Sequence, residues 1–599
     1  MYFRTKTVKN TSLLQLVESY RNAEGQPRQR VVVSLGDARL PENQEKLIAR
    51  AVENDLCGHA DLLPADLTEE GTAWVRRILQ LAGRSKSARP VCSKTIDGVI
   101  IDEVETENVV QLGPQLVALE AWKQLGLSPL LEKAGLNPSQ IATAQLLVAN
   151  RLIEPSSEWA LIDWAERTAL PEMLDLRVTK STKDRLYLAG DALFKHRKLI
   201  EAGLRTHEAD LFNSNGSIVL YDMTNTHFEG FCAKNPKARH GKNKQKRNDC
   251  RQVAIGMAFD SRGLALAHDV FAGAIGETKT LAHMLDRLAL PGSEAAKPVV
   301  ILDAGFASKE NIALLKERSL GYVINITRGS RARHAGAFAA GGFELVPGRD
   351  ARSPVEVKTI TDPDDPDGSL VLCRSALRRE KETAMLSSAE SRFLADIDAL
   401  RQRIGEGRLK DAAKIERAIG RLQKKHPRAN RFYELRHVGG TLEAIRNEER
   451  HAQASELFGD YVLKTERTLS AAETWSLYMV LLQAEEGFAC LKGSLGLRPN
   501  FHQLEHRVEA HIFISVLAYH LLTWIRETLR PAGELRDWKT LRRLLSTHSL
   551  VTTALPLDDG RVLRIRKASR PDPEQIRVYE NLRIEWKTAF LPTKSFAKL

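Results

Sequence analysis

The sequence contains few cysteines, and no two of them have metal-ligand spacing. Six cysteines are scattered over 599 residues without a C-x-x-C pair: Cys57, Cys92, Cys232, Cys250, Cys373 and Cys490. We therefore expect neither a disulfide framework nor a cysteine-ligated zinc site, and a reducing, cytoplasmic environment fits this composition.

Long hydrophobic runs are also missing. The N-terminus, MYFRTKTVKN, has no apolar stretch of the kind that signal peptides carry. The longest apolar run, Ala510 to Ile525, is interrupted by His511 and His520 and is too short and too polar to span a bilayer. A membrane partner is therefore not expected.

Acidic residues are outnumbered by basic ones, 76 to 88, which gives a net charge of +12. An apolar fraction of 43% and a charged fraction of 27% exclude global disorder. The excess of positive charge favours a polyanionic partner such as nucleic acid, although a basic enzyme without such a partner remains an alternative.

A chain of this length is too long for one hydrophobic core, and its hydrophobic periodicity changes several times along the sequence. We expect six regions: an N-terminal basic hairpin of two strands and its linker at 1–107, a helical DNA-binding domain at 108–212, the first part of a catalytic core at 213–326, an insertion at 327–460, the second part of the core at 461–529, and a basic C-terminal region at 530–599.

The catalytic core is predicted as α/β. Short apolar runs predict strands at 217–221, 252–259, 264–271, 298–302 and 322–326, with helices at 277–289 and from about residue 308. The insertion combines strand-like pieces with a charged helical hairpin, whose apolar residues recur from Phe393 to Leu422 around the turn at Gly405. This hairpin is expected to be structural and to carry no chemistry.

Two acids directly follow buried apolar runs: Asp222 in SIVLYDMTNTHFEG and Asp303 in PVVILDAGFAS. The carboxyl ends of strands are where open α/β sheets place their sites, and two carboxylates there would repel each other unless a cation lay between them. Taken singly, an acid at such a position is more often a turn or cap residue, and the pair is the more informative observation.

A third acid is needed to hold two ions. Helical spacing over 472–493 places Tyr478, Glu485 and Lys492 along neighbouring turns, with Glu486 beside Glu485. Glu485 could also be an ordinary helix-surface acid.

These residues resemble the DDE transposases of bacterial insertion sequences, in particular the group with a β-rich insertion and the signature Tyr, two residues, Arg, three residues, Glu, six residues, Lys. Tyr478, Glu485 and Lys492 match that spacing, whereas Leu481 stands at the arginine position. Segments such as ANRLIEPSSEWAL, GETKTLAHML and LKGSLGLRPNFHQLEHRVEAHIFISVLAYHL are also similar to this group.

The resemblance implies a ribonuclease-H-like mixed sheet with flanking helices, interrupted by the β-rich insertion. It implies that Asp222, Asp303 and Glu485 bind two Mg²⁺, for which Mn²⁺ can substitute, with Asp222 bridging both ions. It further implies cleavage at terminal inverted repeats, transfer of the freed 3′-hydroxyl to target DNA, a homodimer on paired ends, and a cytoplasmic, nucleoid-associated protein.

Basic residues near these acids are expected to contact DNA phosphates. The stretch 234–251 holds eight lysines and arginines against one acid. A solvated loop or helix surface is the alternative for all of them. The expected contact residues are Tyr478, Lys492, Arg498, Arg507, Lys242, Lys244, Lys246 and Arg247.

Two further motifs suggest other chemistry. Gly276 to Thr280 resembles the end of a phosphate-binding loop but lacks its glycine spacing. His502, Glu505 and His506 match H-x-x-E-H, in which two histidines on one helical face bind zinc. A zinc metalloprotease is therefore one alternative function, and a non-catalytic DNA-binding protein derived from a transposase is another.

Overall fold

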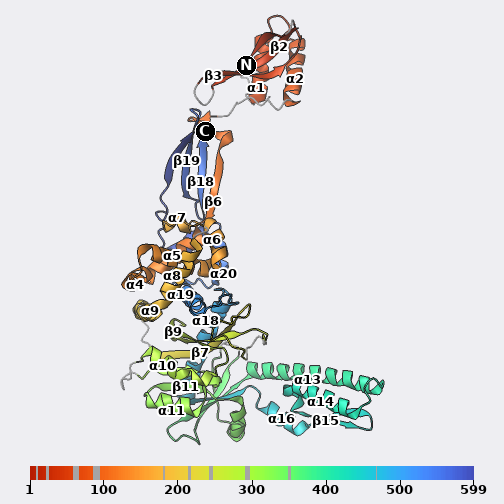
Figure 1. The fold of residues 1–599 in the computed structure, drawn as a ribbon, viewed down its shortest axis with the longest axis vertical. Helices are drawn as coiled ribbons and strands as arrows, with labels where there is room; N and C mark the ends of the chain where they lie inside the picture. Colours follow the sequence, from red (N-terminus) through yellow and green to blue (C-terminus); the bar gives the residue numbers. More distant parts are fainter. Residues whose placement is uncertain are drawn as a thin grey trace. The chain divides into compact units, whose positions relative to one another are not determined.

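The computed structural model describes the chain except for residues 9–10, 22–25, 58–65, 85–94, 180–181, 213–216, 242–246, 248, 291–296, 349–352, 467–468 and 599. Its contacts divide the chain into two compact units (Figure 1). One unit comprises Met1–Val117, Asp163–Arg177 and Lys539–Leu599, and the other comprises Ala118–Ile162 and Val178–Trp538.

The N-terminal segment is a three-stranded antiparallel sheet with two helices. Its elements are β1 (Tyr2–Val8), β2 (Thr11–Arg21), β3 (Pro27–Ser34), α1 (Glu45–Cys57) and α2 (Glu69–Arg84). The two predicted strands correspond to β2 and β3, which pair as an antiparallel hairpin, whereas β1 was not predicted. Strand β1 has no continuous apolar run because residues 4–7 are Arg, Thr, Lys and Thr, yet its Phe3 pairs with Leu16 of β2.

A four-stranded sheet joins segments far apart in the sequence, in the order β20-β19-β18-β6. Its strands are β6 (Glu105–Gln111), β18 (Ser549–Pro556), β19 (Arg561–Ala568) and β20 (Thr593–Lys598), and α21 (Pro573–Asn581) lies between the last two in sequence. Arg564 of β19 pairs with Glu107 of β6 at 2.7 Å. The C-terminal region and the end of the predicted N-terminal region thus form one sheet.

Residues 113–212 are helical, in agreement with the prediction. The helices are α3 (Gly113–Gln124), α4 (Leu127–Lys133), α5 (Pro138–Ile153), α6 (Glu158–Glu166), α7 (Leu170–Met173), α8 (Thr182–Lys195) and α9 (Arg197–Phe212). Helix α5 begins at Pro138 because the side chain of Asn137 and that of Gln140 cap each other's backbone N–H groups. Helices α5 and α8 pack against α19 (Glu505–Leu529).

The second unit contains a nine-stranded sheet in the order β12-β13-β14-β17-β11-β10-β7-β8-β9. Its strands are β7 (Ile218–His227), β8 (Gln252–Phe259), β9 (Ala265–Ala272), β10 (Val299–Leu302), β11 (Gly321–Asn325), β12 (Glu344–Val346), β13 (Val355–Thr361), β14 (Ser369–Ser375) and β17 (Asp460–Thr465). Strand β10 runs parallel to both β7 and β11, and β8 is antiparallel to β7.

Helices cover both faces of this sheet. On one face, α10 (Leu281–Leu288) and α11 (Lys309–Glu317) form a buried core with alternate residues of the central strands, among them Tyr221 and Leu302. On the other face, the ring of Phe259 contacts Phe488 of α18 (Leu482–Lys492) and Tyr519 of α19. The core strands predicted from apolar runs are therefore buried between helices, as expected.

The predicted β-rich insertion differs from the structure in one respect. Strands β12, β13, β14 and β17 extend the central sheet, because β17 pairs with both β14 and β11. Only β15 (Tyr433–Val438) and β16 (Thr441–Arg446) form a separate hairpin. A strand-like sequence pattern indicates a strand but does not indicate which sheet it joins.

The helical hairpin of the insertion has its own core. Helices α13 (Ala376–Gly405) and α14 (Ala412–Lys425), with α15 (Pro427–Asn430), pack beside the β15–β16 hairpin (Figure 1). The predicted apolar residues are buried there, including Phe393, Ile397, Ile415 and Ile419. Helix α16 (Glu448–Glu456) follows the hairpin. The predicted helical hairpin is therefore present, and its apolar residues form a core of their own.

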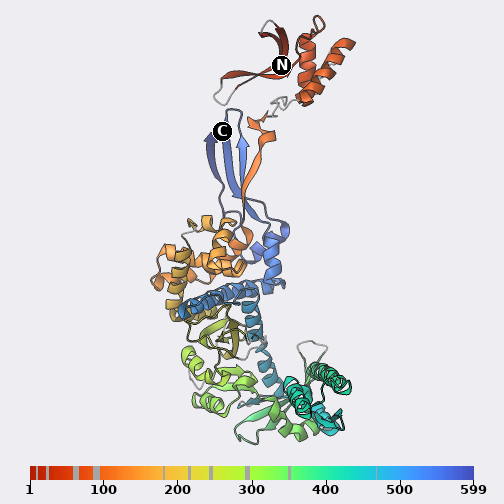
Figure 2. The same ribbon diagram turned by 45° about the vertical axis from the view of Figure 1, so that its right-hand side comes forward.

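Helix α19 is long and apolar enough to cross a membrane, contrary to the expectation drawn from the interrupted apolar run. The whole of its apolar window is buried inside the fold, and it lies along the helices that precede the central sheet (Figures 1 and 2). Its length and composition are those of a core helix, since every residue from 510 to 525 is buried.

Cysteine chemistry also differs in part from expectation. Cys57, at the end of α1, is disulfide-bonded. Cys232, Cys250, Cys373 and Cys490 are free thiols. The scattered spacing of the cysteines did not predict a disulfide.

Candidate active site

Asp222 and Asp303 lie at one edge of the central sheet. Strands β7 and β10 are parallel neighbours, with Tyr221 paired to Leu302. Asp222 is the next residue of β7, and Asp303 directly follows β10 and precedes the short helix η3 (Ala304–Phe306). The structure therefore brings together the two acids that follow buried runs in the sequence.

The two carboxylates differ in their surroundings. Asp222 is half-buried, and its Oδ1 accepts a hydrogen bond of 2.7 Å from the backbone N–H of Met223. Asp303 is exposed. Asp222 is therefore partly removed from water, whereas Asp303 faces solvent.

Glu485 belongs to the first turn of α18, which packs on β7 and β8. The close approach depends on Gly487, where a Cβ atom would lie 2.9 Å from both the Phe259 ring and the Tyr519 hydroxyl. Glu485 is exposed, whereas Glu486 is half-buried. Asp222 and Glu485 thus belong to two elements in direct contact.

The signature residues lie on two helices, not on the one continuous helix that the sequence predicted. Tyr478 belongs to α17 (Ala471–Met479), and Glu485 and Lys492 belong to α18. The N–H groups of Val480 and Leu481 bond to carbonyls three residues back, which tightens the chain between the two helices. Leu481 is only 7% exposed, so the residue at the signature arginine position lies in the core.

Tyr478 connects α17 to the sheet edge. Its hydroxyl accepts a hydrogen bond of 3.0 Å from Nδ2 of Asn325, the last residue of β11. Burial and then the nearby charge of Asp303 raise the pKa of Tyr478 above its ordinary value. Tyr478 is therefore a neutral hydroxyl close to one of the candidate acids.

Glu277 is a further acid at this edge that sequence reasoning missed. It begins the short helix η2 (Glu277–Lys279) after β9, and its carboxylate lies against the backbone of Gly305, where a Cβ atom would overlap it. Its sequence signal was weaker than that of Asp303, because Glu277 follows the end of its strand by several residues and Asp303 follows directly. The resemblance of Gly276 to Thr280 to a phosphate-binding loop is not reflected in the fold, because Thr280 is buried and accepts a hydrogen bond from Tyr221.

The candidate acids offer only carboxylate oxygens, the hard ligands that suit Mg²⁺. Within the described ranges, no group of three or more His, Cys, Asp or Glu side chains is arranged closely enough to hold a metal ion. Asp222 and Asp303 come from paired strands, whereas Glu485 comes from a helix above them. The three carboxylates suit a divalent cation, and Glu485 lies on a different element from the two aspartates.

The H-x-x-E-H pattern does not form the helical zinc site that it predicted. Helix α19 begins at Glu505, so His502 precedes the helix and does not share a helical face with His506. His502 instead lies 3.4 Å from Glu158, with its ring 5.3 Å from that of His511.

The structure describes only some of the residues that were predicted to contact DNA. Lys242, Lys244 and Lys246 lie outside the described residues. Arg247 pairs with Asp249 at 3.0 Å and with Glu229 at 3.7 Å.

The remaining predicted cations belong to α18, α19 and the segment between them. Lys492 lies over the ring of Phe488, and Arg498 is half-buried. Arg507 pairs with Asp191 at 3.0 Å and lies over the ring of Tyr187. Arg507 therefore already takes part in packing between α19 and α8, and its contact with DNA stays a prediction.

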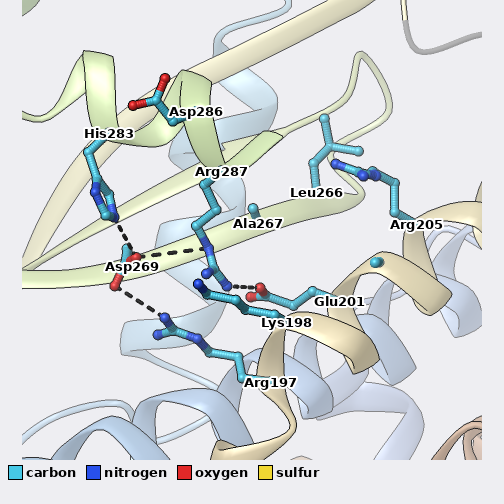
Figure 3. A pocket seen from close by; sticks show the side chains of 11 residues that line it. Arg197, Lys198, Glu201, Arg205, Leu266, Ala267, Asp269, His283, Asp286 and Arg287 are labelled. Atoms are coloured by element: carbon cyan, nitrogen blue, oxygen red, sulfur yellow. Dashed lines mark hydrogen bonds and ion pairs between the residues drawn. The ribbon is translucent and has the colours of Figure 1, made fainter. Parts of the chain in front are cut away.

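A cavity of about 520 Å³ lies at the outer edge of the sheet, between α9, β9 and α10 (Figure 3). Asp269 lies 3.4 Å from Arg197 and 2.8 Å from His283, and Arg287 pairs with Glu201. Burial alone would raise the pKa of Asp269, but Arg197 and His283 outweigh it and lower the pKa to about 2. This ion-pair network joins α9 to the sheet and α10, and none of the three candidate acids lines the cavity.

Comparison with protein families adds two matches. A family model described as transposase DDE domain matches residues 213–521, which include Asp222, Asp303 and Glu485. A second model, described as IS1634 family transposase, N-terminal domain, matches residues 3–59. No curated protein matched the chain.

Proposed function

Because the chain belongs to the DDE transposases, with an N-terminal domain of the IS1634 transposase family, we propose that it binds the ends of its insertion sequence, cleaves them, and joins the freed 3′-hydroxyls to target DNA. The main support for the proposal is the placement of two acids within the matched region. Asp222 and Asp303 directly follow Tyr221 and Leu302, which are paired with each other on two parallel strands.

The sheet topology supports a ribonuclease-H-like core. Five neighbouring strands follow the order β9-β8-β7-β10-β11, in which an antiparallel meander leads into parallel strands. The first acid lies on the first strand of this set and the second acid follows the fourth. Helix α18, which carries Glu485, packs on the face of β7 and β8.

We assign Asp222, Asp303 and Glu485 as the catalytic acids and as the residues that hold two Mg²⁺ ions, or Mn²⁺ in their place. Such ions, when bound, activate the attacking oxygen and stabilise the leaving one in phosphodiester cleavage. The three acids bind and orient, and no covalent enzyme nucleophile is required. Glu485 lies on α18, the helix that packs on β7, the strand of Asp222.

DNA is the proposed partner, as terminal inverted repeats and as target. Arg247, Lys492, Arg498 and the lysines of the 234–251 segment are proposed to bind its phosphates. We also propose a homodimer on paired ends and a cytoplasmic, nucleoid-associated location.

The test is incubation of the purified protein with the DNA that flanks its own gene, in Mg²⁺, with strand breaks mapped to the nucleotide. Breaks at both ends of the element support the proposal. Specific binding without cleavage in either Mg²⁺ or Mn²⁺ would instead support the non-catalytic DNA-binding alternative.

A further inference from the structure

Two loops beside the candidate active site are held against each other. One follows β7 at residues 228–232, and the other precedes α19 at residues 500–504. The N–H of Asn500 donates to the carbonyl of His227 at 3.0 Å, and the N–H of Glu229 donates to the carbonyl of Asn500 at 3.1 Å. The thiol of Cys232 donates to the carbonyl of His502 at 3.5 Å. The positions of both loops are therefore fixed relative to the strand that carries Asp222.

Each loop presents an exposed phenylalanine. Phe231 is 89% exposed and Phe501 is 64% exposed, whereas the neighbouring Phe228 is fully buried. Phe228 therefore anchors the first loop, while the other two rings face solvent. A single exposed apolar side chain is common, but two exposed rings on loops that are hydrogen-bonded to each other offer a partner a surface to bind.

The charges near these rings are mixed, with an excess of cations in the adjacent sequence, where residues 234–251 hold eight lysines and arginines against one acid. Burial and the charges of Arg247 and Arg498 lower the pKa of His227, whereas Glu229 and Asp249 act in the opposite direction, which places both guanidinium groups near the junction of the loops. Arg251 lies close enough to the Cys232 thiol to act on its pKa. Aromatic rings beside cations are the arrangement with which proteins stack on unpaired bases while they bind the nucleic-acid backbone.

We propose that Phe231 and Phe501 stack on or wedge between bases of the bound transposon end, while the surrounding cations bind its phosphates. The inference rests on the proposed transposase function. His227 lies five residues beyond Asp222 on the same strand, a distance of about 16 Å at roughly 3.3 Å per residue. We take the bound DNA to run along β7; at about 3.4 Å per base pair, the loops at the end of that strand then contact the DNA about five base pairs from the scissile phosphate.

The test uses the full-length protein and end DNA that carries 2-aminopurine at single positions. Wild-type protein should raise the 2-aminopurine fluorescence at positions about five base pairs from the cleavage site, because the base there is unstacked. Phe231→Ala and Phe501→Ala should each remove this signal and weaken end binding by roughly 5- to 150-fold, the loss usual for one stacked base. The salt dependence of binding should stay unchanged, because no phosphate contact is removed.

Two kinds of control separate stacking from other effects. Phe501→Trp should retain the fluorescence signal and the affinity, because the indole ring also stacks. Leu345→Ala removes an exposed apolar side chain, 69% exposed, on β12, and should change neither quantity. Urea unfolding midpoints equal to that of the wild type will show that the alanine variants are folded.

The outcomes also distinguish this inference from the proposed function. Suppose that wild-type protein cleaves its own ends and that both alanine variants have the affinity and the 2-aminopurine fluorescence of the wild type. The proposed base contact is then wrong, and the transposase function stands. If wild-type protein neither binds nor cleaves those ends, the proposed function itself fails. A change in self-association of the free protein, with DNA affinity unchanged, would overturn the inference by identifying the rings as a contact between two copies of the chain.

Discussion

The hydroxyl of Tyr478 accepts a hydrogen bond from the side-chain amide of Asn325 at 3.0 Å. Asn325 ends β11, the strand next to β10, and Asp303 follows β10 directly. Tyr478 lies two residues before Val480, where the chain tightens and leads into α18, the helix of Glu485. This bond therefore ties the start of the glutamate helix to the edge that carries the aspartates.

We expect Tyr478→Phe to slow cleavage more than it weakens end binding. The substitution leaves the buried Nδ2 of Asn325 without an acceptor, at a cost of about 1–3 kcal/mol, and it loosens the position of α18. Single-turnover cleavage and DNA affinity, measured on the same protein, check this. Asn325→Ala deletes the donor and leaves the buried Tyr478 hydroxyl without this partner, so it should also slow cleavage. Equal losses of affinity and of cleavage rate in both variants would contradict a positioning role.

Binding to end DNA should weaken steeply with salt. If about 6–10 phosphates are contacted, affinity should fall on the order of 10³- to 10⁵-fold between about 50 and 200 mM salt. Neutralising Lys242, Lys244, Lys246 and Arg247 together should reduce the slope of log affinity against log salt by about 0.9 for each contact removed, without changing which end sequence is preferred.

Neutralising Lys414, Arg417, Arg421 and Lys424, exposed cations of α14, gives the same change of net charge on the insertion hairpin. An unchanged slope in that control assigns the effect to the 234–251 segment. A flat salt response of the wild-type protein would count against DNA as the ligand.

The stability of the core should depend on a buried pair in α19 and α9. Nδ1 of His520 lies 2.7 Å from Oε1 of Glu208. Burial alone would lower the pKa of His520, but the charge and hydrogen bond of Glu208 outweigh it, so its pKa is raised above the ordinary value of 6.5. The stabilisation is therefore complete below pH 6.5 and is lost as the pH rises through the folded-state pKa.

Urea unfolding of the wild type from pH 6 upward should show a falling midpoint over this window, and Glu208→Gln should flatten that fall. An identical pH dependence in the two proteins would show that the His520–Glu208 pair does not cause the fall of the unfolding midpoint.

Much of the sheet could be predicted from sequence because its strands are short, buried apolar runs, such as residues 252–259 and 299–302. The same runs located the two acids. Asp303 directly follows β10, and Asp222 directly follows the apolar residues at the start of β7. Strand β1 could not be predicted this way because it is only partly buried, and the pairing of β17 with both β14 and β11 depends on contacts that no local pattern records.

The glutamate helix shows a different limit. Periodicity aligned Tyr478 with Glu485, but it could not detect the two residues, Val480 and Leu481, at which the helix is tightened. Glu277 was missed because its acid follows its strand by several residues, and its position beside Gly305 depends on the tertiary fold.

Cleavage in trans is expected if two protomers pair the transposon ends. Helix α19 is buried within the chain and is not available as an interface, so we expect a free protein that is monomeric or weakly dimeric and a dimer on paired ends. Glu485→Ala protein mixed with protein neutralised at Lys242, Lys244, Lys246 and Arg247 should recover cleavage that neither shows alone. Failure to recover cleavage at any mixing ratio would reject action in trans.

The most direct test of the account is strand cleavage by single substitutions of the three acids. Asp222→Ala, Asp303→Ala and Glu485→Ala should each abolish Mg²⁺-dependent cleavage of end DNA while end binding stays near the wild-type value, because each removes an ion-binding carboxylate and none supplies the DNA-recognition surface. Glu486→Ala, the adjacent acid on the same helix, should remain active. Retained cleavage in any of the three alanine variants, or its loss in Glu486→Ala with Glu485→Ala active, would contradict the assignment of the site.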